Sequence, residues 1–61
     1  MKIAVAFIDS QHTDNKYIYS DLKYAIKAAI STSREYGYSV LYLEENTIPY
    51  IEIYFKDGMP L

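Results

Sequence analysis

Apolar positions in residues 20–37, SDLKYAIKAAISTSREYG, recur with the period of a helix. At about 100° per residue, one face is apolar or small and the opposite face is polar. The covered face carries Ile18, Leu22, Ala25, Ile26, Ala29, Ile30, Ser33 and Tyr36, and the solvent face carries Lys23, Lys27, Ser31, Arg34 and Glu35. The pattern predicts an amphipathic helix with Ser20 as N-cap, Asp21 in the first turn and Gly37 as the left-handed residue that ends it.

Three other segments have the pattern of β-strands. Residues 2–8, KIAVAFI, are apolar on both faces, which indicates cover on both sides. Residues 38–44, YSVLYLE, and residues 50–56, YIEIYFK, follow the helix and are separated by a turn before Pro49. Strict alternation in the last segment predicts Ile51, Ile53 and Phe55 toward the helix and Tyr50, Glu52, Tyr54 and Lys56 away from it.

The connection between the first strand and the helix, residues 9–19, exceeds the usual length of about four to six residues. It has two interpretations: residues 17–19 form an additional extended segment, or the helix begins earlier and is capped at residues 14–15. We favour a helix that begins at Ser20.

These elements predict an α+β fold for residues 1–61: a single β-α-β-β domain with a three-stranded mixed sheet and one amphipathic helix on one face. The first two strands are expected to be parallel through a right-handed crossover, with the third strand antiparallel to the second. Pro49 places the third strand outermost, in the order 1-2-3. The first strand is then an apolar edge without protection against pairing.

Size and composition favour self-association. A chain of 61 residues buries a limited core, and the absence of cysteine excludes disulfides and thiolate metal sites. We therefore expect a homodimer or a higher even oligomer, joined through the first strand, the face carrying Ala4, Ala6 and Ile8, or both. Eight tyrosines, including Tyr42, Tyr50 and Tyr54 on that face, suit a partly wet interface.

Charge and hydropathy narrow the classes of partner. A net charge of −2 argues against general nucleic-acid binding, which needs a positive surface. No apolar run reaches the length of about 18 residues that a membrane-spanning helix needs, and the amino terminus lacks a signal-peptide pattern, so we expect a cytoplasmic protein.

Asp9, Ser10, His12 and Asp14 follow the carboxyl end of the first strand, where ligands bind in open α/β sheets. Catalysis would also need an orienting group and an oxyanion hole, and a zinc site normally needs three or four ligands. We favour a solvated turn with local hydrogen bonds, and we expect no catalytic residue, metal or cofactor.

The segment KIAVAFID, followed by LKYAIKAAISTSREYGYSVLYLEE, resembles the first β-α-β unit of universal-stress-like nucleotide-binding proteins. The resemblance implies that Asp9 would face a nucleotide. The glycine-rich phosphate loop of that family has no counterpart here, and the pattern is common to many β-α-β units, so membership is not inferred.

The favoured function is non-enzymatic: a small homo-oligomeric protein that binds a macromolecular partner, expected to be a protein. Short chains of this composition are often accessory or inhibitory factors of phages and mobile elements, which is an association and not a physical argument. One alternative is a small-ligand or nucleotide site in residues 9–14. The other is stacking of single-stranded nucleic acid on the tyrosines, which the nearby Glu44, Glu45 and Glu52 disfavour.

Overall fold

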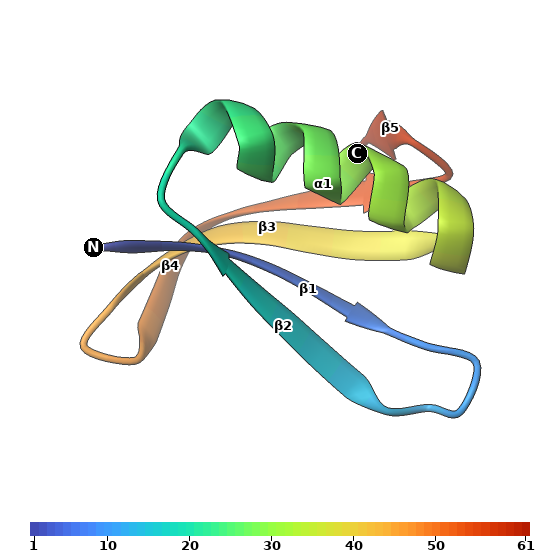
Figure 1. The fold of residues 1–61 in the computed structure, drawn as a ribbon, viewed down its shortest axis with the longest axis horizontal. Helices are drawn as coiled ribbons and strands as arrows, with labels where there is room; N and C mark the ends of the chain where they lie inside the picture. Colours follow the sequence, from blue (N-terminus) through green and yellow to red (C-terminus); the bar gives the residue numbers. More distant parts are fainter.

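The segment between the first strand and the helix folds back as a strand, and this decides the topology. The computed structural model describes residues 1–61 as a five-stranded sheet with one helix packed on it (Figure 1). The elements are β1 (Lys2–Ile8), β2 (Asp14–Tyr19), α1 (Leu22–Tyr36), β3 (Tyr38–Glu45), β4 (Ile48–Lys56) and β5 (Met59–Pro60). The sheet order is β2-β1-β3-β4-β5, with every neighbouring pair antiparallel.

The prediction of a three-stranded mixed sheet is therefore wrong. Because β2 reverses the chain before α1, β3 runs antiparallel to β1 and not parallel to it, and the β-α-β unit implied by the resemblance is absent. β1 lies between β2 and β3, so it is not an exposed edge. The predicted adjacency of β1, β3 and β4 is confirmed, and β4 gains a second neighbour only at Phe55 and Lys56.

The ends of α1 follow local hydrogen bonding. The N-cap is Asp21, whose carboxylate accepts from the Lys23 backbone N–H at 2.8 Å, so the predicted N-cap at Ser20 is one residue too early. Asp21 also brings negative charge to the positive end of the helix. Gly37, with φ 89°, confirms the predicted left-handed ending.

Small residues let α1 approach the sheet closely. Ala25, Ala29 and Ser33 are fully buried against a core that includes Val5, Leu41 and Phe55. Two serines tie the layers together: Ser39 Oγ donates to the Ala29 carbonyl at 2.7 Å, and Ser33 Oγ accepts from the Gly58 N–H at 2.8 Å. The predicted solvent face of the helix is exposed, whereas Leu22 and Ile26 are more exposed than expected. No helix is long and apolar enough to cross a membrane.

A β-bulge in β4 changes which side chains face outward. Ile51 has φ 54°, and the pairing shifts so that Tyr42 opposes Glu52 while Leu43 opposes Tyr50. Since an extra residue moves the remaining side chains to the other face, Tyr50 shares the helix side with Leu43. The predicted alternation, with Tyr50 outward and Ile51 inward, is therefore wrong.

Candidate protein-binding face

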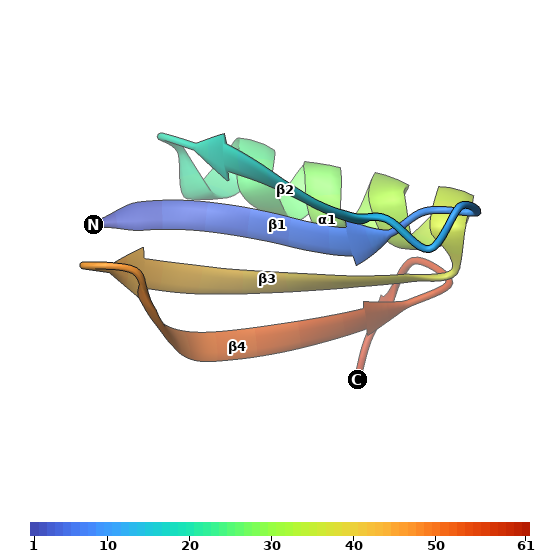
Figure 2. The same ribbon diagram turned by 90° about the horizontal axis from the view of Figure 1, so that it is seen from below.

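The surface of the sheet opposite α1 is left uncovered, as Figure 2 shows from the sheet side. Strand pairing arranges its side chains in three rows that each cross β2, β1, β3 and β4 in that order, and we call these rows the open face. The rows are Asp14, Ile8, Tyr38 and Lys56; then Lys16, Ala6, Val40 and Tyr54; then Ile18, Ala4, Tyr42 and Glu52. Ile8 is placed beside Tyr38 by continuing the β1–β3 register two residues past the Ala6–Val40 pair.

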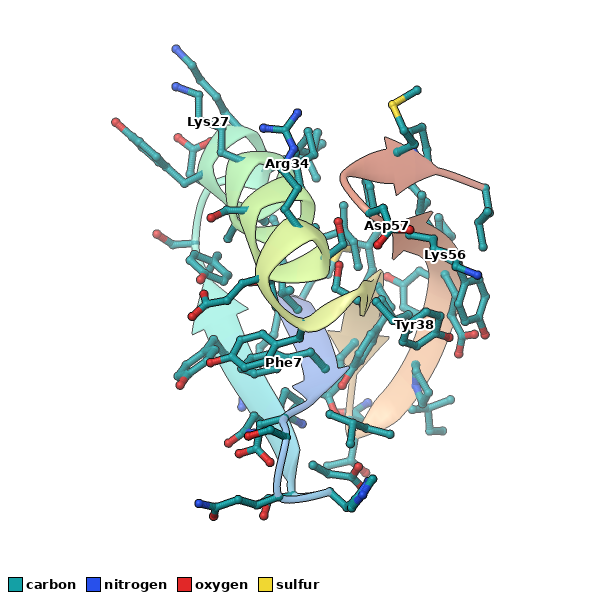
Figure 3. The ribbon with its side chains drawn as sticks, turned by 90° about the vertical axis from the view of Figure 1, so that its right-hand side faces the viewer. Phe7, Lys27, Arg34, Tyr38, Lys56 and Asp57 are labelled. Atoms are coloured by element: carbon teal, nitrogen blue, oxygen red, sulfur yellow. The ribbon has the colours of Figure 1, made fainter.

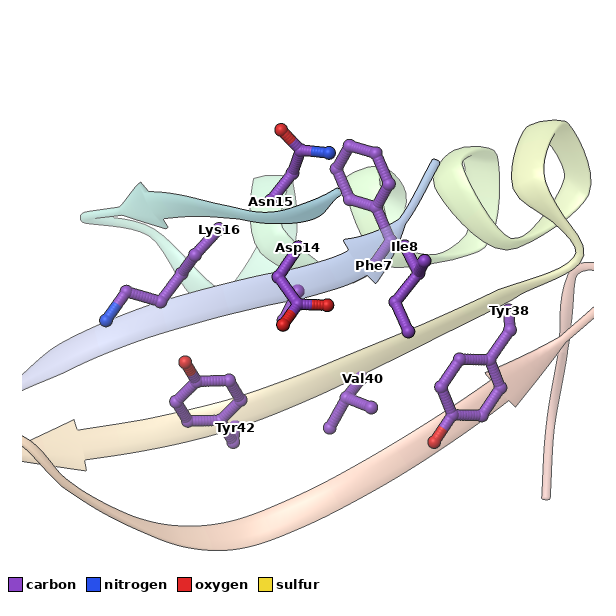
Figure 4. A pocket seen from close by; sticks show the side chains of 9 residues that line it. Phe7, Ile8, Asp14, Asn15, Lys16, Tyr38, Val40 and Tyr42 are labelled. Atoms are coloured by element: carbon purple, nitrogen blue, oxygen red, sulfur yellow. The ribbon is translucent and has the colours of Figure 1, made fainter. Parts of the chain in front are cut away.

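The centre of the open face is hollow (Figure 4). A cavity of about 370 Å³ lies over Ala6 and Val40, which are cross-strand partners. Tyr42 bounds one end of it, and Ile8 and Tyr38 bound the other. Small side chains between large ones produce this hollow, which is lined mainly by apolar atoms and can receive a protruding apolar side chain.

An ion pair crosses β1 beside the cavity. Lys16 Nζ lies 3.2 Å from both carboxylate oxygens of Glu44, joining β2 to β3 at the level of Ala4. The hydrogen bond to Glu44 raises the pKa of Lys16, and the nearby Tyr42 adds to the shift. Ala4 is fully buried within the chain, so this predicted interface residue is not accessible to a partner.

Aromatic side chains are fixed on the β4 side of the open face. The rings of Tyr38 and Tyr54 are 6.1 Å apart and inclined by 33°. The Tyr54 hydroxyl donates to the Glu52 carboxylate, and this hydrogen bond, together with the charge of Glu52, raises the pKa of Tyr54. Figure 3 shows Tyr38 beside Lys56, its cross-strand partner.

Two charged side chains of the open face have no partner within the chain. Asp14 on β2 and Lys56 on β4 make no side-chain hydrogen bond and no ion pair, unlike Lys16 and Glu52. They stand at opposite ends of one row, so the face carries an unpaired acid on one side and an unpaired base on the other.

The alternative ligand site predicted in residues 9–14 spans the turn of the β1–β2 hairpin. Asp9 Oδ1 accepts from the backbone N–H groups of Gln11 and Thr13 at 2.9 and 3.0 Å, and Oδ2 accepts from Asn15 Nδ2 at 3.2 Å. Ser10 and His12 are exposed in this turn, and Asp14 alone of the four candidates belongs to the open face. No group of three or more His, Asp or Glu side chains is arranged to hold a metal ion.

The hydrogen bonds of Asp9 predict a dependence of stability on acid. The Thr13 N–H, with Gln11 and Asn15, lowers the pKa of Asp9. A carboxyl whose pKa is lower in the folded state stabilises the fold above its unfolded pKa, about 4, and loses that contribution as the pH falls through the folded pKa. We expect Asp9→Asn to lower the urea midpoint at neutral pH. The variant should also lose less additional stability below about pH 4 than the unmodified chain does.

Asp57→Asn is the matched control, because Asp57 lies in the turn between β4 and β5 and its side chain makes no hydrogen bond and no ion pair. Circular dichroism across the acid range should separate the two variants. If Asp9→Asn lost as much stability on acidification as the unmodified chain does, Asp9 would not be the source of the acid dependence.

Sequence reasoning placed Ala6, Ile8, Tyr42 and Tyr54 on the open face, and the structure brings them there. It missed the contribution of β2, because residues 14–19 were not assigned as a strand. It also missed Tyr38 as part of the face. The alternation of Tyr38, Val40 and Tyr42 along β3 was the signal that could have revealed Tyr38.

Comparison of the chain with models of known protein families, with curated protein sequences and with solved structures finds no match, so inference about function rests on the geometry of this face.

Proposed function

We propose that the protein is a non-enzymatic binding protein that holds another protein surface on its open face and works as a homo-oligomer. The observation that carries this proposal is the cavity over Ala6 and Val40, on a sheet face that α1 leaves uncovered. Soluble domains rarely leave a contiguous apolar surface without a partner. A role as an accessory or inhibitory factor would need no more than such a face.

The charges of the open face favour protein over nucleic acid. Two of its four charged side chains, Asp14, Lys16, Glu52 and Lys56, are acidic. Lys16 is already held by Glu44, and Glu52 lies beside Tyr54. A platform for single-stranded nucleic acid combines stacked aromatics with a positive groove, and here Tyr50 lies on the helix side of the sheet. The engagement of Asp9 in the hairpin turn likewise supports binding on the open face over ligand chemistry in the loop.

Site-specific photo-cross-linking tests this proposal. Ile8 lines the cavity and is half exposed, so p-benzoyl-phenylalanine can replace it without entering the core. We expect irradiation of this variant, pure or in cell extract, to give adducts that protease removes and nuclease does not. The same replacement at Lys27, on the solvent face of α1, is the control and should give far fewer adducts. Equal yields at both positions, or adducts removed by nuclease, would contradict the proposal.

A further inference from the structure

We propose that the occupant of the open face is a second copy of this chain, related by a two-fold axis parallel to the strands that sets Asp14 of each copy against Lys56 of the other. This inference rests on the proposed function, since it names the partner of the same face. It follows from the order of side chains along the rows and from the two charges without a partner.

The outermost complete row reads acid, aliphatic, aromatic, base: Asp14, Ile8, Tyr38 and Lys56. A two-fold axis that lies between the two sheets, along the boundary of β1 and β3, reverses this order in the second copy. β2 then faces β4 of the second copy, and β1 faces β3. The acid meets the base at both ends of the row, and Ile8 meets the ring of Tyr38.

The other rows are compatible with the same operation. Ala6 meets Val40 of the second copy, so the two hollows face each other as one apolar space, which the Ile8 and Tyr38 side chains of both copies border and must enter for the sheets to pack. Lys16 approaches Tyr54 and the Glu52 carboxylate that holds its hydroxyl. Along β2 the charges run from negative at Asp14 to positive at Lys16, and along β4 they run from positive at Lys56 to negative at Glu52, one level beyond Lys16, so the two edges are complementary in sign.

An axis that runs across the strands does not give this match. It sets β2 against β2 and β4 against β4, so Asp14 cannot meet Lys56. The base then nearest to Asp14 is Lys16, which Glu44 already holds at 3.2 Å. The axis parallel to the strands is the arrangement that gives both unpaired charges a partner of opposite sign.

The size of the face suits a stable pair. A specific interface usually buries about 800 Å² of each partner, which is under one fifth of the 4370 Å² that this chain exposes. The open face is one whole side of a two-layer molecule measuring 29 × 22 × 18 Å, so its area is of that order. Two sheets packed face to face keep their strands within about 30° of each other, as the axis requires.

Two charge reversals and their mixture test the arrangement. Asp14→Lys leaves two lysines facing each other at both ends of the row, and Lys56→Asp leaves two aspartates. Each variant alone should dimerise roughly tenfold or more weakly than the unmodified chain in sedimentation equilibrium, because two attractions become repulsions. Mixed at equal concentration, the two variants should form a heterodimer at close to the original strength, since each contact again joins an acid to a base.

Lys27→Asp, on the solvent face of α1, makes the same change of net charge as Lys56→Asp and should dimerise normally. Neither Asp14 nor Lys56 bonds within the chain, so both reversals should keep the circular dichroism of the unmodified chain. The inference is overturned if the unmodified chain is monomeric up to millimolar concentration, if Asp14→Lys dimerises normally, or if the mixture forms no heterodimer. A monomer that still cross-links other proteins from position 8 defeats this inference and the homo-oligomeric part of the proposed function, and leaves standing the binding of another protein on the open face. The absence of any adduct defeats both proposals.

Discussion

Replacing Phe55 with alanine is expected to unfold a large fraction of the chain at room temperature. Phe55 is 5 % exposed and packs in the one cluster that joins sheet and helix, with Val5, Ala29 and Leu41 among its neighbours. Removing a buried phenylalanine ring costs about 3–5 kcal/mol. A domain of this length has a total stability of only about 3–9 kcal/mol, so the loss consumes most of it. Urea titration followed by circular dichroism measures the change.

Ile53→Ala, two residues earlier on the same strand, is the control for that experiment. Ile53 is 41 % exposed, so truncation removes less buried surface and should cost under about 1.5 kcal/mol. If the two substitutions cost the same, the core has been placed wrongly, and the helix does not pack on this part of β4.

Ala6→Glu is expected to abolish self-association while leaving the fold in place. Ala6 forms part of the floor of the cavity, where a glutamate side chain can still reach water in the separated chain. In the proposed pair the same carboxylate would be buried opposite Val40, beside only Lys16, which Glu44 already holds, at a cost of several kcal/mol. Sedimentation equilibrium should show dimerisation weakened by roughly a hundredfold or more.

Ser31→Glu places the same charge on the exposed face of α1 and should leave association unchanged. An Ala6→Glu variant that associates like the unmodified chain would show that the contact lies elsewhere on the molecule. Circular dichroism on both variants separates loss of association from loss of structure.

The helix was predictable because its signals are local. The spacing of Ala25, Ala29 and Ser33 gives the buried stripe, and Gly37 marks the end. The N-cap was misplaced by one residue because Ser20 and Asp21 are both good caps, and the backbone conformation decides between them.

β2 was not assigned because its sequence, DNKYIY, begins with three polar residues and lies at an edge of the sheet. The long connection and the extended character of residues 17–19 were the available signals, and the turn that makes the hairpin depends on Asp9 accepting three hydrogen bonds. Because β2 was not predicted, β1 and β3 were predicted to be parallel, whereas they are antiparallel.

Part of the candidate face depended on non-local structure. The bulge at Ile51 has no signal in the sequence, because a β-branched residue rarely adopts a positive φ, and it moved Tyr50 to the helix side. The burial of Ala4 depends on β2, since Lys16 must lie across β1 to reach Glu44. Ala6, Ile8 and Tyr42 could be placed correctly because simple alternation holds in β1 and in β3.

Isotope-filtered NMR on an equal mixture of labelled and unlabelled chain tests most directly whether two copies meet through the open face. The filter retains only contacts between chains, so neighbours within one chain do not contribute. We expect contacts from the Ile8 methyl groups to the Tyr38 ring, and from Ala6 to Val40, at concentrations where the chain sediments at twice 7.1 kDa. Contacts between chains that arise from the solvent face of α1, with none from Ile8 or Ala6, would contradict this prediction.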